Sequence, residues 1–268
     1  MTRVNKKYSF LKPLKIPNLV RLGRNADGGY VVDLNVIKKS NILISFGMGS
    51  DWSFELDCIK KNKDMKIYMY DYSISSYPYI KEIWKYFKRF ITLRVKYQDL
   101  LTRVEYFCRY LKFLNLKNIV FLKKKITYPK KNKNDIDIDD VFIGVNIQEK
   151  VVIKSDIEGS EYEIIDQILK YSTRIEMLVL EFHFIDVNEK IFFESVKKLQ
   201  EFFNIIHIHG NNHGYQLDTG IPCHLEITFL NKKYSLETHE HLIDFPIKEL
   251  DYPNNPYKKD LFFSFTED

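Results

Sequence analysis

The chain has 268 residues, including 20 Phe and 18 Tyr, and a formal net charge of +5 at pH 7. A chain of this length can bury a substantial core, so one larger α/β domain is the simplest organisation. No apolar run is long enough for a transmembrane helix. A nucleic-acid partner is not expected, because we find no basic face interleaved with aromatic side chains on a known binding module.

The N-terminal stretch and the cysteines both favour a cytoplasmic protein. Residues 1–7 are polar and basic, and the apolar region of a secretion signal does not follow them. Cys58, Cys108 and Cys223 are odd in number and have no metal or redox spacing, so we expect free thiols in a reducing compartment.

In chain order, an irregular lead-in over 1–20 comes first, and then Asp27-Gly28 marks a hairpin turn. The apolar run 42–46 is typical of a strand buried on both faces. It leads into Gly47-Met48-Gly49 and then into helical spacing over 54–62. Glycines allow φ > 0 and the close approach of a ligand, and the helix directs free N–H groups to the same place. This unit predicts a small-ligand site, although a tight turn alone also needs glycine.

Further strands and helices alternate along the rest of the chain. Short apolar runs predict strands at 66–70, 91–95, 119–122, 151–155, 176–184, 204–208 and 223–230, with 119–122 preferred as the third strand of the sheet. Helical spacing predicts helices at 78–89, 99–114, 139–143, 159–170 and 190–203. The first of these helices has four apolar residues on one face: Ile80, Ile83, Trp84 and Phe87.

This alternation predicts a parallel sheet with helices on both faces, and the last two strands, with no helix between them, predict an antiparallel finish. No composition shift suggests a boundary, so we expect one domain over 1–268. It would consist of a lead-in with a hairpin (1–40), a core sheet (41–230) and a C-terminal extension (231–268). The lysine-rich stretch 112–133 is interpreted as a solvated loop or as a contact for an anionic substrate.

Polar residues follow most of the predicted strands. In a sheet of this type ligands bind beyond the carboxyl ends of the strands. Each residue also has a structural explanation, such as a helix cap or a satisfied histidine, but their shared edge favours a site. They are Gly47, Met48 and Gly49 after the first strand, Asp71 after the second, Asp156 and Glu158 after the fourth, Glu181 and His183 on the fifth, and His209 to Asn212 after the sixth.

Asp71 lies about two dozen residues after the glycine turn, where an acid accepts hydrogen bonds from a ribose diol. The turn has no third glycine at the spacing that a dinucleotide pyrophosphate requires. A cofactor with a ribose and no pyrophosphate fits better, and S-adenosylmethionine is such a cofactor.

The run 152–161, with sequence VIKSDIEGSE, resembles the IK-x-D-x-E-G-x-E signature of FkbM-type S-adenosylmethionine-dependent methyltransferases. The similarity extends over roughly 21–230 and includes Asp27 to Tyr30, Phe46 to Gly49, Leu178 to His183 and His209 to Asn212. It implies an α/β, class I methyltransferase-like (Rossmann-like) fold. That fold has a seven-stranded, mostly parallel sheet with an antiparallel last strand and helices on both faces. The implied reaction is O-methylation of a sugar, a glycan or a related small hydroxylated acceptor. The lysine-rich stretch departs from the family pattern.

The resemblance also implies roles for individual residues. Gly47 and Gly49 would border the methionine part of the cofactor and Asp71 would hold its ribose, with Asp156 and Glu158 facing the transferred methyl group and the acceptor. His183 or His209 would be the base for the acceptor hydroxyl, and Glu181 would orient the ring of His183. The implied sets are Phe46, Gly47, Met48, Gly49, Asp71, Tyr72 and Asp156 for the cofactor, and His183, His209, Asp156, Glu158 and Glu181 for catalysis.

Three alternatives remain at this stage. Asp156, Glu181, His183 and His209 could hold a divalent metal instead, although a metal is not expected. The chain could be a nicotinamide-dependent oxidoreductase on a similar sheet, against which the missing third glycine argues. It could also be a non-catalytic binding module of the same fold.

Overall fold

A computed structural model describes residues 1–145, 149–234 and 240–266 of the chain. The predicted C-terminal extension is therefore described except for 235–239 and 267–268. Of the helices in the described ranges, none is long and apolar enough to cross a membrane.

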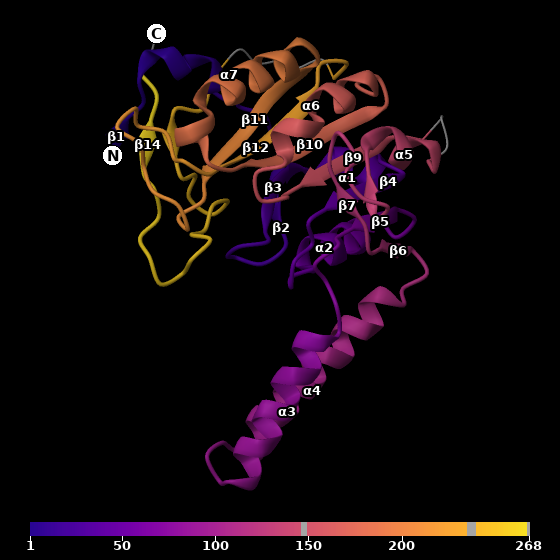
Figure 1. The fold of residues 1–268 in the computed structure, drawn as a ribbon. Helices are drawn as coiled ribbons and strands as arrows, with labels where there is room; N and C mark the ends of the chain where they lie inside the picture. Colours follow the sequence, from indigo (N-terminus) through magenta and orange to yellow (C-terminus); the bar gives the residue numbers. More distant parts are fainter. Residues whose placement is uncertain (146–148, 235–239, 267–268) are drawn as a thin grey trace.

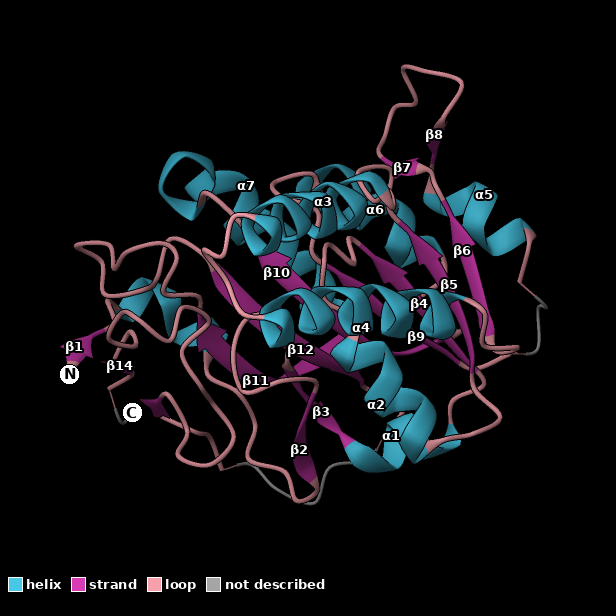
Figure 2. Ribbon diagram, turned by 90° about the horizontal axis from the view of Figure 1, so that it is seen from below, coloured by secondary structure: helices cyan, strands magenta, loops and turns pink. Residues whose placement is uncertain are grey.

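The central sheet has seven strands in the order β11-β12-β10-β9-β4-β5-β6 (Figures 1 and 2). All neighbours pair in parallel except β12, which is antiparallel to both β10 and β11. The predicted mostly parallel sheet with an antiparallel last strand is confirmed, including 119–122 as the third strand of the sheet. Its strands are β4 (Ile42–Phe46), β5 (Lys66–Tyr70), β6 (Ile119–Leu122), β9 (Val151–Ser155), β10 (Ile175–Phe182), β11 (Phe203–Gly210) and β12 (Leu225–Asn231).

Helices cover both faces of this sheet, as expected for strands that are predominantly apolar and mostly buried. In β4, Ile42, Ile44 and Phe46 pack into one buried cluster, whereas Leu43 packs into another. The first cluster lies under α5 (Ile138–Ile143), α6 (Glu161–Lys170) and α7 (Ile185–Phe202). The second lies under α1 (Leu34–Lys39), α2 (Ser53–Lys61) and the hairpin of β2 (Leu19–Leu22) with β3 (Tyr30–Asp33).

The lead-in and the C-terminal extension pair with each other, although they are distant in sequence. After β1 (Thr2–Arg3) comes a 3-10 helix, η1 (Lys6–Leu11), where the sequence predicted irregular chain. β1 is parallel to β14 (Phe263–Ser264), which is antiparallel to β13 (Asp244–Phe245). This small sheet joins the lead-in to the C-terminal extension, and its residues Phe245 and Phe263 pack into the same buried cluster as β4.

The helices α3 (Tyr77–Ile91) and α4 (Tyr97–Leu114) form a hairpin that projects away from the sheet (Figure 1). The helices are confirmed, but the strand predicted at 91–95 is wrong, because α3 runs to Ile91 and a tight turn follows. The apolar face predicted for α3 is not buried either: Ile80, Trp84 and Phe87 are exposed. Periodicity in the sequence identifies an amphipathic helix, but it does not show whether another part of the protein covers the apolar face.

The lysine-rich stretch is not a single solvated loop, because it includes the end of α4 and the whole of β6. Within it, β7 (Lys125–Ile126) pairs in parallel with β8 (Asp135–Ile136), which follows the stretch and precedes the predicted short helix α5. The Nζ of Lys130 lies 2.7 Å from Asp140 and 3.4 Å from Asp137, so this part of the charge is neutralised locally. Lys124 and Lys125, in contrast, line the cavity described next.

Candidate functional site

A cavity of about 470 Å³ lies at the carboxyl ends of β4, β5, β6 and β9, within the size range of ligand sites. Gly47 and Gly49 form its inner edge with φ of 72° and 59°, which non-glycine residues rarely adopt. A Cβ on Gly47 would lie 1.6 Å from the carbonyl oxygen of Asp156, so the turn packs directly on the end of β9. A Cβ on Gly49 would meet no atom within 4 Å. The wall is therefore open at Gly49.

Asp71 fixes this turn from the end of β5. Its Oδ2 accepts a hydrogen bond from the N–H of Gly49 at 2.9 Å, and its Oδ1 accepts from the N–H and the hydroxyl of Ser73 at 2.7 and 2.6 Å. Six of the seven predicted cofactor residues line the cavity, namely Gly47, Met48, Gly49, Asp71, Tyr72 and Asp156. Phe46 is fully buried and packs against Tyr70, so it supports the turn from behind.

Asp156 connects the cavity with a buried polar group beside it. The hydroxyl of Tyr30 donates a hydrogen bond to its Oδ2 at 2.9 Å, and the Nζ of Lys154 lies 3.6 Å from the same oxygen. Lys154 also donates to the carbonyl oxygen of Gly47. Burial, and after it the charge of Asp156, raises the pKa of Tyr30 well above its usual value, so Tyr30 keeps its proton.

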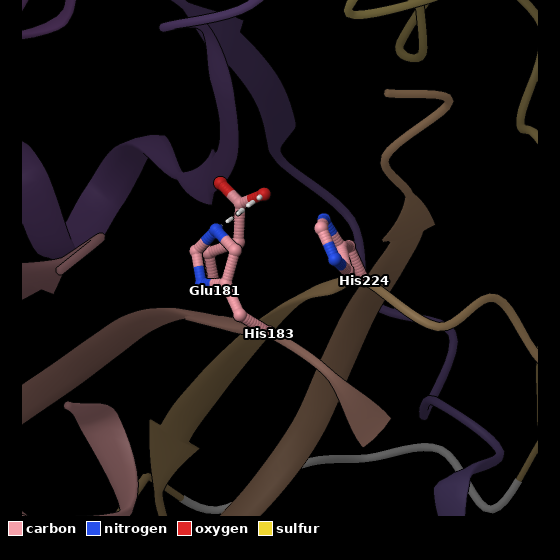
Figure 3. A group of neighbouring side chains, drawn as sticks. All are labelled: Glu181, His183 and His224. Carbon is pink, nitrogen blue, oxygen red and sulfur yellow. Dashed lines mark ion pairs between the residues drawn. The ribbon is translucent and has the colours of Figure 1, made fainter. Parts of the chain in front are cut away.

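His183 lies behind Asp156, in contact with four carboxyl groups (Figure 3 shows it beside Glu181). Its Nδ1 is 3.1 Å from Glu161, and its Nε2 is 3.5 Å from Glu181, 3.7 Å from Glu158 and 3.8 Å from Asp156. Burial lowers its pKa, but the hydrogen bond to Glu161 and the charges of Glu181, Glu161 and Asp156 outweigh burial and raise it to about 10. His183 therefore holds its proton near neutral pH.

Glu181 and Glu161 have different hydrogen-bond partners in this group. Glu181 accepts a hydrogen bond from the side-chain amide of Asn211 at 2.6 Å. Burial, and then the charges of Asp156 and Glu226, raise the pKa of Glu181 well above its usual value. Glu161 is fully buried and accepts from the N–H groups of Ile157 and Gly159, which fixes the loop after β9 as well as the ring of His183.

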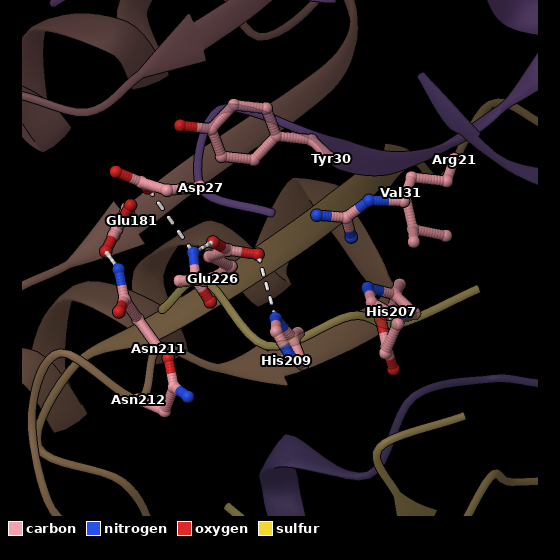
Figure 4. Close-up of polar contacts among 12 residues, drawn as sticks. Arg21, Asp27, Tyr30, Val31, Glu181, His207, His209, Asn211, Asn212 and Glu226 are labelled. Carbon is pink, nitrogen blue, oxygen red and sulfur yellow. Dashed lines mark hydrogen bonds and ion pairs between the residues drawn. The ribbon is translucent and has the colours of Figure 1, made fainter. Parts of the chain in front are cut away.

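His209 lies in the neighbouring part of the buried polar network, where its partner is Glu226 rather than Asp156 or Glu181 (Figure 4). Its Nδ1 lies 3.2 Å from Glu226 and its Nε2 3.5 Å from Asp260. In the sheet, Glu226 of β12 lies in register between Glu181 of β10 and His209 of β11. Because β12 separates those two strands, His209 lies about 10 Å along the sheet from Glu181.

The alternative metal set of Asp156, Glu181, His183 and His209 is therefore not assembled as one group. Among the described residues, two groups of side chains have spacings that fit a metal ion, and neither contains His209. They are Glu181 with His183 and His224, and Asp156 with Glu161 and His183.

The protonation of His209 makes the free energy of unfolding depend on pH. Burial lowers its pKa, but Asp260, Glu226 and Asp251 raise it to about 10. The pKa of His209 is higher in the folded protein than its value of about 6.5 in the unfolded chain. Protonated His209 therefore stabilises the fold fully below pH 6.5, and this contribution is lost as pH rises through 10. We expect His209→Gln to lower the free energy of unfolding by a few kcal/mol near pH 6.5, and the difference from wild type to shrink toward pH 10.

Urea unfolding at a series of pH values measures this difference. His213→Gln, at an exposed histidine, is the control and should follow wild type. A difference between His209→Gln and wild type that stays constant with pH would contradict the prediction.

Sequence reasoning did not select several residues of the group. Tyr30, Lys154 and Glu161 all lie in motifs that carry the family resemblance, which was the available signal. His224 follows a different pattern: it lies just before β12, and its ring centroid is 5.0 Å from that of His183. No sequence spacing relates these two histidines, because the inserted β12 brings them together.

Residues 109–217 match the family model described as the methyltransferase FkbM domain. The match confirms the resemblance to FkbM-type methyltransferases and, with it, an S-adenosylmethionine-dependent methyltransferase rather than a nicotinamide-dependent oxidoreductase. It includes Asp156, Glu158, Glu161, Glu181, His183 and His209. None of the curated proteins searched matches the chain.

Three solved structures illustrate what this chain is similar to. The fibrillarin pre-rRNA processing protein of Methanococcus jannaschii is 15% identical, with a TM-score of 0.39, over 73% of this chain and 68% of that one. Human methyltransferase-like protein 13, in complex with SAH, is 11% identical with a TM-score of 0.39, over 77% of each chain. Aeropyrum pernix fibrillarin, with bound S-adenosyl-L-methionine, is 12% identical with a TM-score of 0.36, over 82% and 86%.

Proposed function

We propose that this FkbM-type methyltransferase transfers the methyl group of S-adenosylmethionine to a hydroxyl oxygen of a sugar, a glycan or a related small acceptor. The observation that carries the proposal is the position of Asp156, which lines the cavity beside the glycine turn and also lies 3.8 Å from His183. Asp27 and Glu158 line the same cavity. Carboxylate oxygens accept hydrogen bonds from hydroxyl groups, so this acidic wall supports a polyhydroxylated acceptor.

The residues at the glycine turn fit the nucleoside part of S-adenosylmethionine. The open wall at Gly49 leaves room for a ligand where any side chain would intrude. Asp71 accepts three hydrogen bonds from the protein, and an ionised carboxylate has capacity for about four, so it retains an acceptor site for a ribose hydroxyl. Tyr72 and Ile126 line the cavity with apolar surface suited to an adenine ring.

A residue of the protein itself accepts the proton of the acceptor hydroxyl. S-adenosylmethionine supplies an electrophilic methyl group, and the acceptor must lose its proton as the C–S bond breaks and the C–O bond forms. Since His183 already holds a proton, we assign acceptance of the hydroxyl proton to Asp156. Tyr30 donates to one of its oxygens, and His183 lies nearest the other. Asp156 is then the catalytic residue, and Tyr30 and His183 are positioning residues.

The proposal does without a metal ion. Protonated His183 places a positive charge among the same carboxyl groups that a divalent cation would neutralise. We also place the enzyme in the cytoplasm, supported by Cys58, Cys108 and Cys223, all of which are free thiols.

Cofactor binding tests the proposal. We expect calorimetry to detect binding of S-adenosylmethionine and of its demethylated product, and Asp71→Ala to weaken both roughly 10- to 100-fold, since hydrogen bonds to a charged group are lost. Asp218→Asn, at an exposed aspartate away from the cavity, is the control and should bind as wild type does. Binding of NADH without binding of S-adenosylmethionine would refute the proposal.

A further inference from the structure

The α3–α4 hairpin presents a continuous apolar stripe to solvent. None of the residues of α3 is buried. Ile83, Tyr86 and Phe90 are half-buried, whereas Ile80, Trp84, Phe87 and Ile91 are 42, 58, 40 and 62% exposed. The exposed four are spaced by four, three and four residues, so they lie along one side of the helix. At the tip of the hairpin, Leu93 is 90% exposed.

Positive charge flanks this stripe. Residues 77–114 contain nine Lys and Arg against three Asp and Glu, an excess of six, so the rest of the chain has a net charge of −1. Lys81, Lys85 and Lys88 each follow a residue of the stripe directly in sequence. In the described part of the chain, the only ion pair within the hairpin joins Lys85 to Glu82 at 3.5 Å. The hairpin therefore has basic side chains available for an anionic partner.

From these observations we propose that the α3–α4 hairpin docks on an anionic phospholipid surface, with Trp84, Ile91 and Leu93 entering the headgroup region and the flanking Lys and Arg contacting lipid phosphates. An amphipathic helix with Trp, Phe and Ile on one face and Lys and Arg beside it is the pattern of interfacial membrane binding. A second copy of the chain is disfavoured as the occupant, because two hairpins with six excess positive charges each would repel one another.

The base of the hairpin is joined to the candidate active site. The hydroxyl of Tyr106 in α4 donates to the carbonyl oxygen of Ser50, next to Gly49, at 2.8 Å. Tyr79 of α3 stacks on Tyr110 of α4 at a ring-centroid distance of 4.7 Å, which holds the two helices together at this end. Docking would thus place the glycine turn next to the membrane, and this inference does not depend on the identity of the acceptor.

Sedimentation of the full-length protein with vesicles tests the proposal. We expect binding to vesicles of phosphatidylcholine mixed with phosphatidylglycerol, and little binding to phosphatidylcholine alone. Each basic side chain near such a surface contributes about fivefold to partitioning, so Lys81→Gln/Lys88→Gln/Arg89→Gln should bind about a hundredfold more weakly. Trp84→Ser/Ile91→Ser/Leu93→Ser should lose binding by at least tenfold, since it removes the inserted apolar surface.

Ile143→Ser/Val187→Ser is the matched control, because both residues are exposed and apolar outside the hairpin, at 83 and 76%. It should bind as wild type does, and all variants should keep the wild-type melting temperature and cofactor affinity. Equal binding to both kinds of vesicle, or unchanged binding by either triple variant, would overturn the proposal. The proposal would also be overturned if the protein did not bind vesicles and instead formed dimers or bound single-stranded RNA, with that interaction lost in the apolar triple variant.

Discussion

Asp156→Asn is expected to lower kcat by roughly 10²–10⁴-fold while leaving the affinity for S-adenosylmethionine within a few-fold of wild type. The substitution keeps the size of the side chain and its hydrogen bond from Tyr30, but an amide cannot accept the acceptor proton. Single-turnover rates with a carbohydrate acceptor and labelled cofactor measure the effect separately from product release. Asp218→Asn again provides the control.

His183→Gln separates positioning from proton transfer. Removal of the cation beside Asp156 leaves the proton acceptor itself in place, so kcat should fall by less than in Asp156→Asn. An unchanged melting temperature would separate this effect from a loss of fold. If Asp156→Asn kept full turnover, the general-base assignment would be wrong. If a chelator and His183→Gln each abolished turnover as well, the two groups that contain His183, one of them with His224, would be the metal ligands to test.

Most of the sheet was predictable because burial on both faces leaves a local signature. Strands β4, β5 and β9 are short apolar runs that end in a turn residue, and that pattern requires no knowledge of partners. The antiparallel finish followed from the absence of a helix between the last two strands. The tight turn after Ile91 was missed because Ile91 to Val95 is as apolar as a strand, and only contact with the sheet distinguishes the two.

The site was only partly predictable, for a reason of topology. His183 and His209 both lie at carboxyl ends of parallel strands, so the sequence treats them alike. The structure separates them with β12, which pairs His209 with Glu226 and brings His224 to His183 instead. Spacing along the chain specifies which edge of a sheet a residue reaches, whereas strand order specifies its neighbours. Asp71 and the glycine turn were predictable because they belong to adjacent strands in a single β–α–β unit.

Gly47→Ala should cause the largest loss of stability, about 3–5 kcal/mol. Its Cβ would lie 1.6 Å from the carbonyl oxygen of Asp156 and 2.8 Å from the carbonyl carbon, and backbone cannot rotate away as a side chain can. The ends of β4 and β9 would have to separate. That separation would strain the hydrogen bonds that Gly47 makes to Tyr70 and that Asp156 makes to Phe46, both 3.1 Å long.

Gly49→Ala is the matched comparison, because it places the same methyl group two residues away in the same turn. Its positive φ costs about 1–2 kcal/mol, but the added Cβ would meet no atom within 4 Å. We expect a folded protein that binds S-adenosylmethionine at least tenfold more weakly, since the methyl group occupies the open wall of the cavity. Urea unfolding and calorimetry on the two variants measure both effects. Equal stability of the two variants would contradict the packing of the turn on β9, and unchanged affinity in Gly49→Ala would place the cofactor elsewhere.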